Sequence, residues 1–94
     1  MPLYKLSKDA VIEIFEDGAL VQNLGNRHLV ELNPSAAVIV SLLDGQRTPE
    51  QVAEEIVKEH DISHDYPITQ VIQDVLELCR ELNKIGILDF QPAD

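Results

Sequence analysis

The sequence contains few cationic side chains, one cysteine and no tryptophan. Its 94 residues include 7 Lys and Arg against 17 Asp and Glu, which gives a formal net charge of −10. Contacts to nucleic-acid phosphates are normally made by Lys or Arg, so this deficit disfavours a nucleic acid as the main partner. The single Cys79 excludes an internal disulfide framework. With two Tyr and two Phe as the aromatic residues, the core must be aliphatic.

Long apolar runs are also missing. The longest, residues 36–40, is far shorter than the roughly 20 residues needed to span a bilayer. The N-terminus has no sustained apolar region with a small-residue cleavage site, so nothing marks the chain for export. We therefore expect a soluble, cytoplasmic protein that does not act at a membrane. The length allows one hydrophobic core, and the 45% apolar content is typical of a folded chain. We expect a single domain, residues 1–94, with its core over about 9–90.

The first third of the sequence predicts strands. Val11–Phe15 and Ala19–Leu24 are rich in β-branched or aromatic residues, and the Asp17-Gly18 signal between them favours a hairpin. A third run, Arg27–Leu32, follows the turn signal Gly25-Asn26. Alternation in a strand would place His28, Val30 and Leu32 on one face and Arg27, Leu29 and Glu31 on the other. These runs predict a three-stranded antiparallel meander.

Three helices are predicted after the meander. Asn33-Pro34 combines an N-cap with proline at the first helical position, and opens a largely apolar helix that ends before Asp44-Gly45. Thr48-Pro49 repeats this signal for a second helix, which runs to about His60. A third helix should run from Pro67 to near Lys84. Between and after these helices we expect a polar loop at 61–66, a short extended segment at 87–90 and a frayed tail at 91–94.

The predicted fold is therefore α+β and resembles a winged helix-turn-helix domain. Its last helix carries apolar residues over about half of its circumference, which is more than one packing stripe requires. This set includes Ile72, Val75, Leu76, Leu78 and Cys79. The third strand and this helix could form a groove with a backbone wall and an aliphatic wall, able to accept an extended peptide. Alternatively, Leu29, Leu76 and Leu78 only pack against other parts of the fold.

No motif in the sequence indicates catalysis or metal binding. His28, His60 and His64 do not have the spacing of metal ligands on one helix face. Cys79 lies in an apolar helix stripe without a base placed beside it. No phosphate loop, nucleophile elbow or zinc-ligand spacing is present. We expect a binding protein without enzymatic activity, cofactor or metal.

The rival interpretation is a DNA-binding winged-helix regulator. Residues 1–47 carry 4 basic and 6 acidic side chains (−2), whereas residues 48–94 carry 3 and 11 (−8). The last helix offers Asp74, Glu77 and Glu81 against Arg80 and Lys84. A helix entering the major groove needs basic and amide side chains, so the charge favours a peptide over DNA.

The sequence also resembles the PqqD-like family, over about residues 9–89. The resemblance is carried by two motifs, Leu32-Asn33-Pro34-Ser35-Ala36 and Leu42-Leu43-Asp44-Gly45, and continues through Arg47-Thr48 and Asp74-Val75-Leu76 to Gly86-Ile87-Leu88. The family often has an aromatic residue near Val40, and loop 61–66 is longer than usual for the family. These two departures leave the subfamily open.

The resemblance implies a recognition element for ribosomally made, post-translationally modified peptides. Such a domain binds the leader of a precursor peptide as an added strand and presents it to a leader peptidase or a radical SAM modifying enzyme. A lasso-peptide pathway is preferred here over the quinone-cofactor pathway. Acidic leader residues would then meet Arg27, Arg80 or Lys84. The implied peptide-binding residues are Arg27, His28, Leu29, Val30, Glu31, Leu32, Ile72, Val75, Leu76, Cys79 and Arg80.

Overall fold

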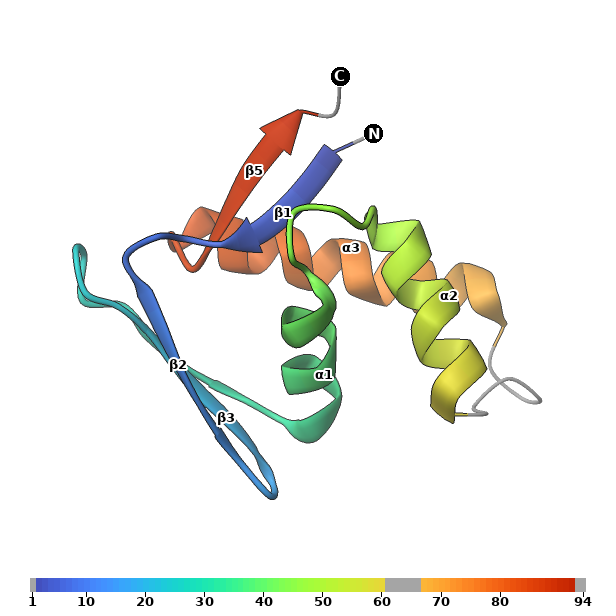
Figure 1. The fold of residues 1–94 in the computed structure, drawn as a ribbon, viewed down its shortest axis with the longest axis horizontal. Helices are drawn as coiled ribbons and strands as arrows, with labels where there is room; N and C mark the ends of the chain where they lie inside the picture. Colours follow the sequence, from blue (N-terminus) through green and yellow to red (C-terminus); the bar gives the residue numbers. More distant parts are fainter. Residues whose placement is uncertain (1, 61–66, 93–94) are drawn as a thin grey trace.

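The computed structural model describes residues 2–60 and 67–92, which form a mixed fold of two small antiparallel sheets and three helices (Figure 1). The predicted loop 61–66, with His64, lies outside the described residues. The elements are β1 (Pro2–Leu6), β2 (Ala10–Phe15), β3 (Gly18–Asn23), β4 (Leu29–Leu32), α1 (Pro34–Leu42), α2 (Pro49–His60), α3 (Ile68–Lys84) and β5 (Leu88–Pro92).

The predicted meander is confirmed. Strands β2, β3 and β4 form one antiparallel sheet in that order, and Ile12, Val21 and Val30 lie side by side across it. The third strand is shorter than predicted, because it begins at Leu29 and not at Arg27. Arg27 has a left-handed backbone, with φ of 65°, which is the conformation of a turn. The chain therefore turns through Arg27 before pairing resumes.

A second sheet joins the two ends of the described chain. β1 pairs antiparallel with β5, so that Tyr4 lies opposite Phe90, and their rings meet edge to face at 5.5 Å. The sequence analysis did not predict β1. It also predicted a frayed tail from Gln91, which is wrong for Gln91 and Pro92 because both pair with β1. Residues 93–94 lie outside the described part. Local patterns do not reveal a pairing between segments about 85 residues apart.

The helix starts follow the predicted capping signals. The Asn33 side chain accepts a hydrogen bond from Ala36 N at 2.8 Å, and Pro34 occupies the first helical position. At the start of α2, Gln51 N donates to Thr48 Oγ1 at 3.2 Å while Thr48 N donates to Gln51 Oε1 at 2.8 Å. This reciprocal pair is a capping box. Both helices therefore begin where their local sequences dictate.

The core lies between the inner face of the meander and the helices (Figure 1). It is aliphatic, as the composition requires, and Tyr4 is its aromatic member. The sheet and the helices each contribute a fully buried side chain. These are Val21 from β3, Val40 from α1, Val52 from α2 and Val75 from α3. The β1–β5 sheet adds Leu88. This packing fixes the position of α3 behind the meander.

One buried asparagine connects the meander to the end of α3. Asn23 is 6% exposed, and its Nδ2 donates to Gly86 O at 2.7 Å. Its Oδ1 accepts from Gly25 N at 2.7 Å and from Asn26 N at 3.1 Å. Gly86 has φ of 81°, and a Cβ there would lie 2.6 Å from Asn26 Nδ2, so glycine is required. We call Asn23 and Gly86 the asparagine clamp.

Replacing Asn23 should therefore destabilise the fold more than replacing its exposed neighbour. Asn23→Ala removes three partly buried hydrogen bonds, and should lower the free energy of unfolding by about 2–3 kcal/mol. Asn26→Ala removes two exposed bonds, to Ile85 O and from His28 N, and should cost about 1 kcal/mol or less. Urea denaturation followed by circular dichroism measures both. Equal losses of unfolding free energy in the two variants would contradict the structural role assigned to the asparagine clamp.

Candidate functional site

β4 is an edge strand whose outward backbone groups can be identified. It pairs with β3 on one side, and within residues 2–60 and 67–92 no strand pairs with its other side. Asn23 N donates to His28 O at 2.9 Å, and the register places Val21 opposite Val30. Hydrogen-bonded pairs alternate with unbonded pairs in antiparallel sheets. The N–H and C=O groups of Leu29 and Glu31 therefore point away from β3.

The side chains of β4 alternate as predicted for residues 29–32. Val30 and Leu32 turn toward the core, where Leu32 is buried, whereas Leu29 is 61% exposed and Glu31 is also exposed. Arg27 and His28 precede the strand and are exposed. The four outward backbone groups thus lie beside an exposed leucine and an exposed carboxylate. An exposed edge of this kind is a template for an additional strand.

Helix α3 has a buried seam with two different flanks. Val71, Val75, Cys79 and Leu82 form the seam. At about 100° per residue, Ile72, Leu76 and Arg80 lie on one side of the seam, which we call the Leu76 flank. Asp74, Leu78, Glu81 and Ile85 lie on the other side, which we call the Leu78 flank. The hydrogen bonds and charges around α3 indicate which flank is near β4.

The Leu78 flank is the one on the side of β4. Asn26, in the loop that leads into β4, donates its Nδ2 to Ile85 O at 3.1 Å. On the opposite flank, Arg80 lies close enough to Tyr4 of β1 to affect its ionisation. Burial raises the pKa of the Tyr4 hydroxyl above 10.0, Cys79 raises it further, and the charge of Arg80 opposes the rise. Arg80, on the Leu76 flank, is therefore the cation of α3 whose charge acts on β1.

This placement divides the eleven residues predicted for the site. The backbone of β4 and the exposed Leu29 and Glu31 belong to the edge, with Arg27 and His28 at its start. Val75 and Cys79 are 0% exposed, and Leu32 is also buried, so these three side chains form part of the core and do not line a surface groove. Ile72, Leu76 and Arg80 lie on the flank away from β4.

Leu78, Glu81 and Ile85 lie on the flank beside β4. Leu78 and Ile85 are half-buried and pack against the core, and Glu81 is exposed. Periodicity alone could have shown that these residues share a flank. It could not show that this flank is next to β4, because that depends on the long-range hydrogen bond from Asn26 to Ile85.

The structure gives no support for chemistry at Cys79. Burial raises the pKa of its thiol from 9.0 to about 12, although the charge of Arg80 acts in the opposite direction. The thiol is therefore neutral at physiological pH, and a neutral thiol is a poor nucleophile. In the described part of the chain, no group of three or more His, Cys, Asp or Glu side chains could hold a metal ion.

Cys79 should consequently react with a thiol reagent only when the chain unfolds. At pH 8, we expect labelling by dithionitrobenzoate to be at least about a hundredfold slower in buffer than in denaturing urea, because the native thiol is both inaccessible and protonated. Absorbance at 412 nm follows the reaction. Rapid labelling of the folded protein would show that Cys79 is accessible and would contradict its assignment to the core.

Among the described helices, none has the length and apolar character to cross a bilayer.

Comparison with known proteins gives one family match and two similar solved structures. A family model described as coenzyme PQQ synthesis protein D (PqqD) matches residues 18–88. The structure of TbiB1 in complex with the TbiA(beta) leader peptide is 23% identical, with a TM-score of 0.78, and the match covers 96% of this chain and 99% of that one. No curated protein matches the chain significantly.

The second similar structure is a lasso peptide synthetase B1 complexed with the leader peptide. It is 21% identical, with a TM-score of 0.76, over 92% of this chain and 96% of that one. Both likenesses extend over nearly the whole chain, so the fold described above is that of these two proteins.

Proposed function

This chain belongs to the PqqD family, and on that premise we propose that it binds the leader segment of a precursor peptide and presents it to a processing enzyme. The observation that carries the proposal is the free edge of β4, where the backbone groups of Leu29 and Glu31 point outward beside the Leu78 flank. The leader would add to the sheet as a fourth strand on β4. The chain itself would act as an adaptor without catalytic activity.

The pathway proposed is that of a lasso peptide. The two similar structures, TbiB1 and a lasso peptide synthetase B1, are both complexes with leader peptides. They support this choice over a quinone-cofactor pathway. The partner enzyme would then be a leader peptidase. The buried, neutral Cys79 is consistent with an adaptor, because it leaves the described chain without an activated thiol.

The chemistry of the leader follows from the walls of the site. Alternate side chains of an added strand would project between β4 and α3, where Leu78 and Ile85 offer apolar surface. Glu81 adds a carboxylate to this wall, so a basic residue in the leader would be favoured there. This differs from the sequence-based expectation, in which acidic leader residues would meet Arg27, Arg80 or Lys84. Of these three residues, Arg80 is on the opposite flank of α3 from Glu81, and Arg27 precedes β4.

DNA binding is not favoured by the same geometry. A recognition helix needs cationic or amide side chains on its exposed surface. On α3, the exposed Glu77 and Glu81 oppose Arg80 and Lys84, and the whole chain carries a net charge of −10. The phosphate backbone would therefore be repelled at least as strongly as it is attracted.

Proline at an outward-facing position of β4 tests the strand-addition step. Leu29→Pro removes an N–H that points to the free edge, and proline is tolerated at such edge positions. We expect Leu29→Pro to weaken binding of the leader peptide from a neighbouring precursor gene. The expected loss of affinity is about threefold to tenfold, which corresponds to one hydrogen bond. Leu29→Ala keeps the N–H and serves as the control. Isothermal titration calorimetry measures both affinities, and equal effects would contradict strand addition.

The assignment of the α3 wall is tested by two matched leucines. Leu78→Asn places an amide on the flank beside β4, whereas Leu76→Asn makes the same change on the opposite flank. We expect Leu78→Asn to reduce leader affinity about tenfold through lost apolar contact, and Leu76→Asn to change it by less than about twofold. Thermal unfolding of each variant identifies effects due to misfolding. The reverse ranking would place the leader on the Leu76 flank.

A further inference from the structure

The meander has an outer face, turned away from the helices, that is apolar and uncovered within the described residues. Val11 lies beside Gln22 and Leu29 in one row across the sheet, and Glu13 lies beside Leu20 and Glu31 in the next. Phe15 continues this face toward the hairpin. Val11, Phe15 and Leu29 are 53%, 45% and 61% exposed. Contiguous exposed apolar side chains of this kind usually mark an interaction surface.

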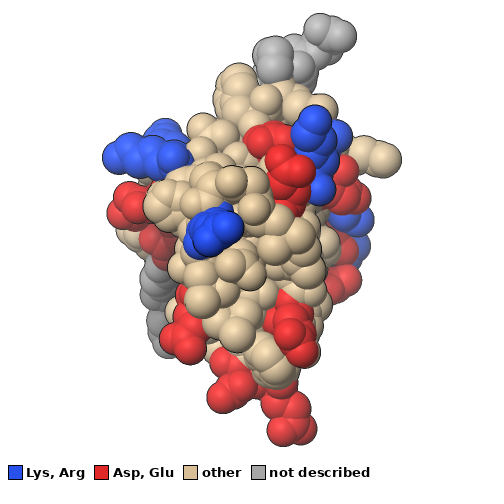
Figure 2. Space-filling model, turned by 90° about the vertical axis from the view of Figure 1, so that its left-hand side faces the viewer, with Lys and Arg blue, Asp and Glu red and all other residues tan. Residues whose placement is uncertain are grey.

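Carboxylates lie among and beside these apolar side chains. Glu13 and Glu31 flank Leu20 within the sheet, and Glu16 and Asp17 form the hairpin turn next to Phe15. Over residues 10–32 the chain has these four acidic side chains and one basic side chain, Arg27. Figure 2, which views this side of the molecule, shows a mostly uncharged surface with a basic side chain near its centre, basic groups at its upper edges and acidic groups along its lower margin and sides.

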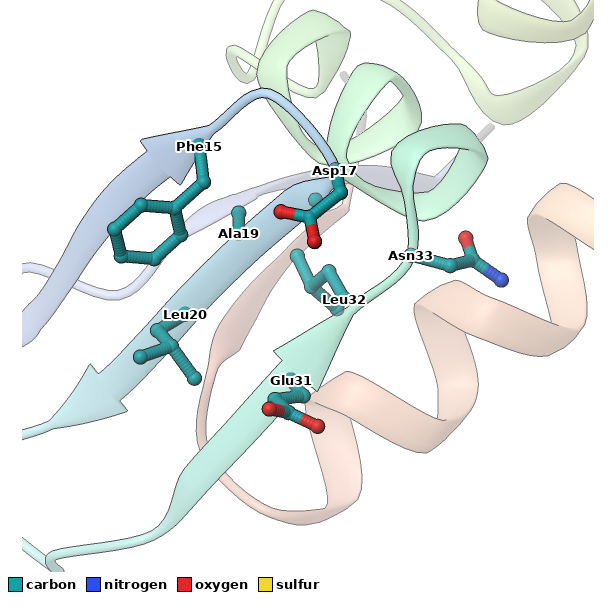
Figure 3. Close-up of a pocket in the computed structure, with 8 residues that line it drawn as sticks. Phe15, Asp17, Ala19, Leu20, Glu31, Leu32 and Asn33 are labelled. Carbon is teal, nitrogen blue, oxygen red and sulfur yellow. The ribbon is translucent and has the colours of Figure 1, made fainter.

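A hollow at the hairpin end of the outer face is lined by both apolar side chains and carboxylates. Its volume is about 480 Å³, and its lining includes Phe15, Leu20, Asp17 and Glu31. Figure 3 shows the carboxylates of Asp17 and Glu31 on opposite sides of the space that Phe15 and Leu20 border. A lysine or arginine side chain suits such a space, since its apolar stem can lie on Phe15 and Leu20 while its cationic head meets the carboxylates.

We propose that the outer face of the meander is the docking surface for the processing enzyme, which would present an apolar patch bordered by lysine or arginine. This inference rests on the proposed function for the identity of the partner. The charge pattern argues against a second copy of this chain as the occupant, because a symmetric contact would bring like carboxylates together. The leader would occupy the free edge of β4 and not the outer face, so both partners can bind at once.

Two variants of the outer face and two matched controls test the proposal. Glu13→Lys with Asp17→Lys reverses two charges, and Glu54→Lys with Glu59→Lys makes the same net change on the exposed side of α2. Phe15→Ser removes an exposed aromatic ring, and Phe90→Ser does so on β5, where the ring is 50% exposed. Each purified variant is titrated against the immobilised processing enzymes encoded beside this chain, and separately against the leader peptide.

We expect the two outer-face variants to lower enzyme affinity at least about tenfold, as at the centre of a protein interface. The two control variants should stay within about twofold of the original chain, and all four should bind the leader as the original chain does. The association rate of the original chain should also fall as salt is raised, because charge complementarity speeds encounter.

Several results would overturn the proposal. These are enzyme binding unaffected by the outer-face variants, equal losses in the controls, or no binding of the original chain to any of those enzymes. A dimer of the original chain in sedimentation, dissociated by Phe15→Ser, would instead assign the face to a second copy. Failure of the leader titration with enzyme binding intact would overturn the proposed function and support this docking surface.

Discussion

The hydrogen bond from Asn23 Nδ2 to Gly86 O at 2.7 Å supports the site, together with the packing of α3 against the core. Asn23 ends β3 and organises the turn before β4, whereas Gly86 follows the end of α3. Because the bond joins these two points, the free edge of β4 is held beside a helix and does not open into solvent alone. A strand edge alone offers backbone pairing with little selectivity, and a neighbouring helix wall adds pockets for side chains. The asparagine clamp thus holds the edge strand beside the helix, as the proposed recognition site requires.

The distribution of charge gives each surface of this small fold a different character. The Leu78 flank combines apolar side chains with Glu81, and the outer face of the meander combines Phe15 and Leu20 with Asp17 and Glu31. Both surfaces therefore favour partners that are apolar and basic. The net charge of −10 disfavoured nucleic acid at the start, and the structure places Glu81 on one of these surfaces and Asp17 and Glu31 on the other. Under the proposed function, this charge would help to select partners.

Local signals in the sequence predicted most of the fold. The Asp17-Gly18 hairpin, the Asn33-Pro34 start and the Thr48 capping box all act within a few residues, and each element is found close to its predicted position. The β1–β5 sheet could not be predicted this way, because it pairs the two ends of the chain. The edge position of β4 was predicted from the sequence, and the residues of α3 that would contact a leader remain a prediction. Helical periodicity defines two flanks of α3, and it cannot say which of them lies beside β4, because that depends on long-range interactions such as the Asn26–Ile85 hydrogen bond.

Strand addition at β4 is the central claim, and amide hydrogen exchange measured by NMR tests it most directly. In the free chain, the amides of Val30 and Leu32 should exchange slowly because they bond to β3, while those of Leu29 and Glu31 should exchange rapidly because they face the free edge. With saturating leader peptide, Leu29 and Glu31 should become protected while Val30 and Leu32 change little. Leader binding without protection at Leu29 and Glu31 would contradict the account.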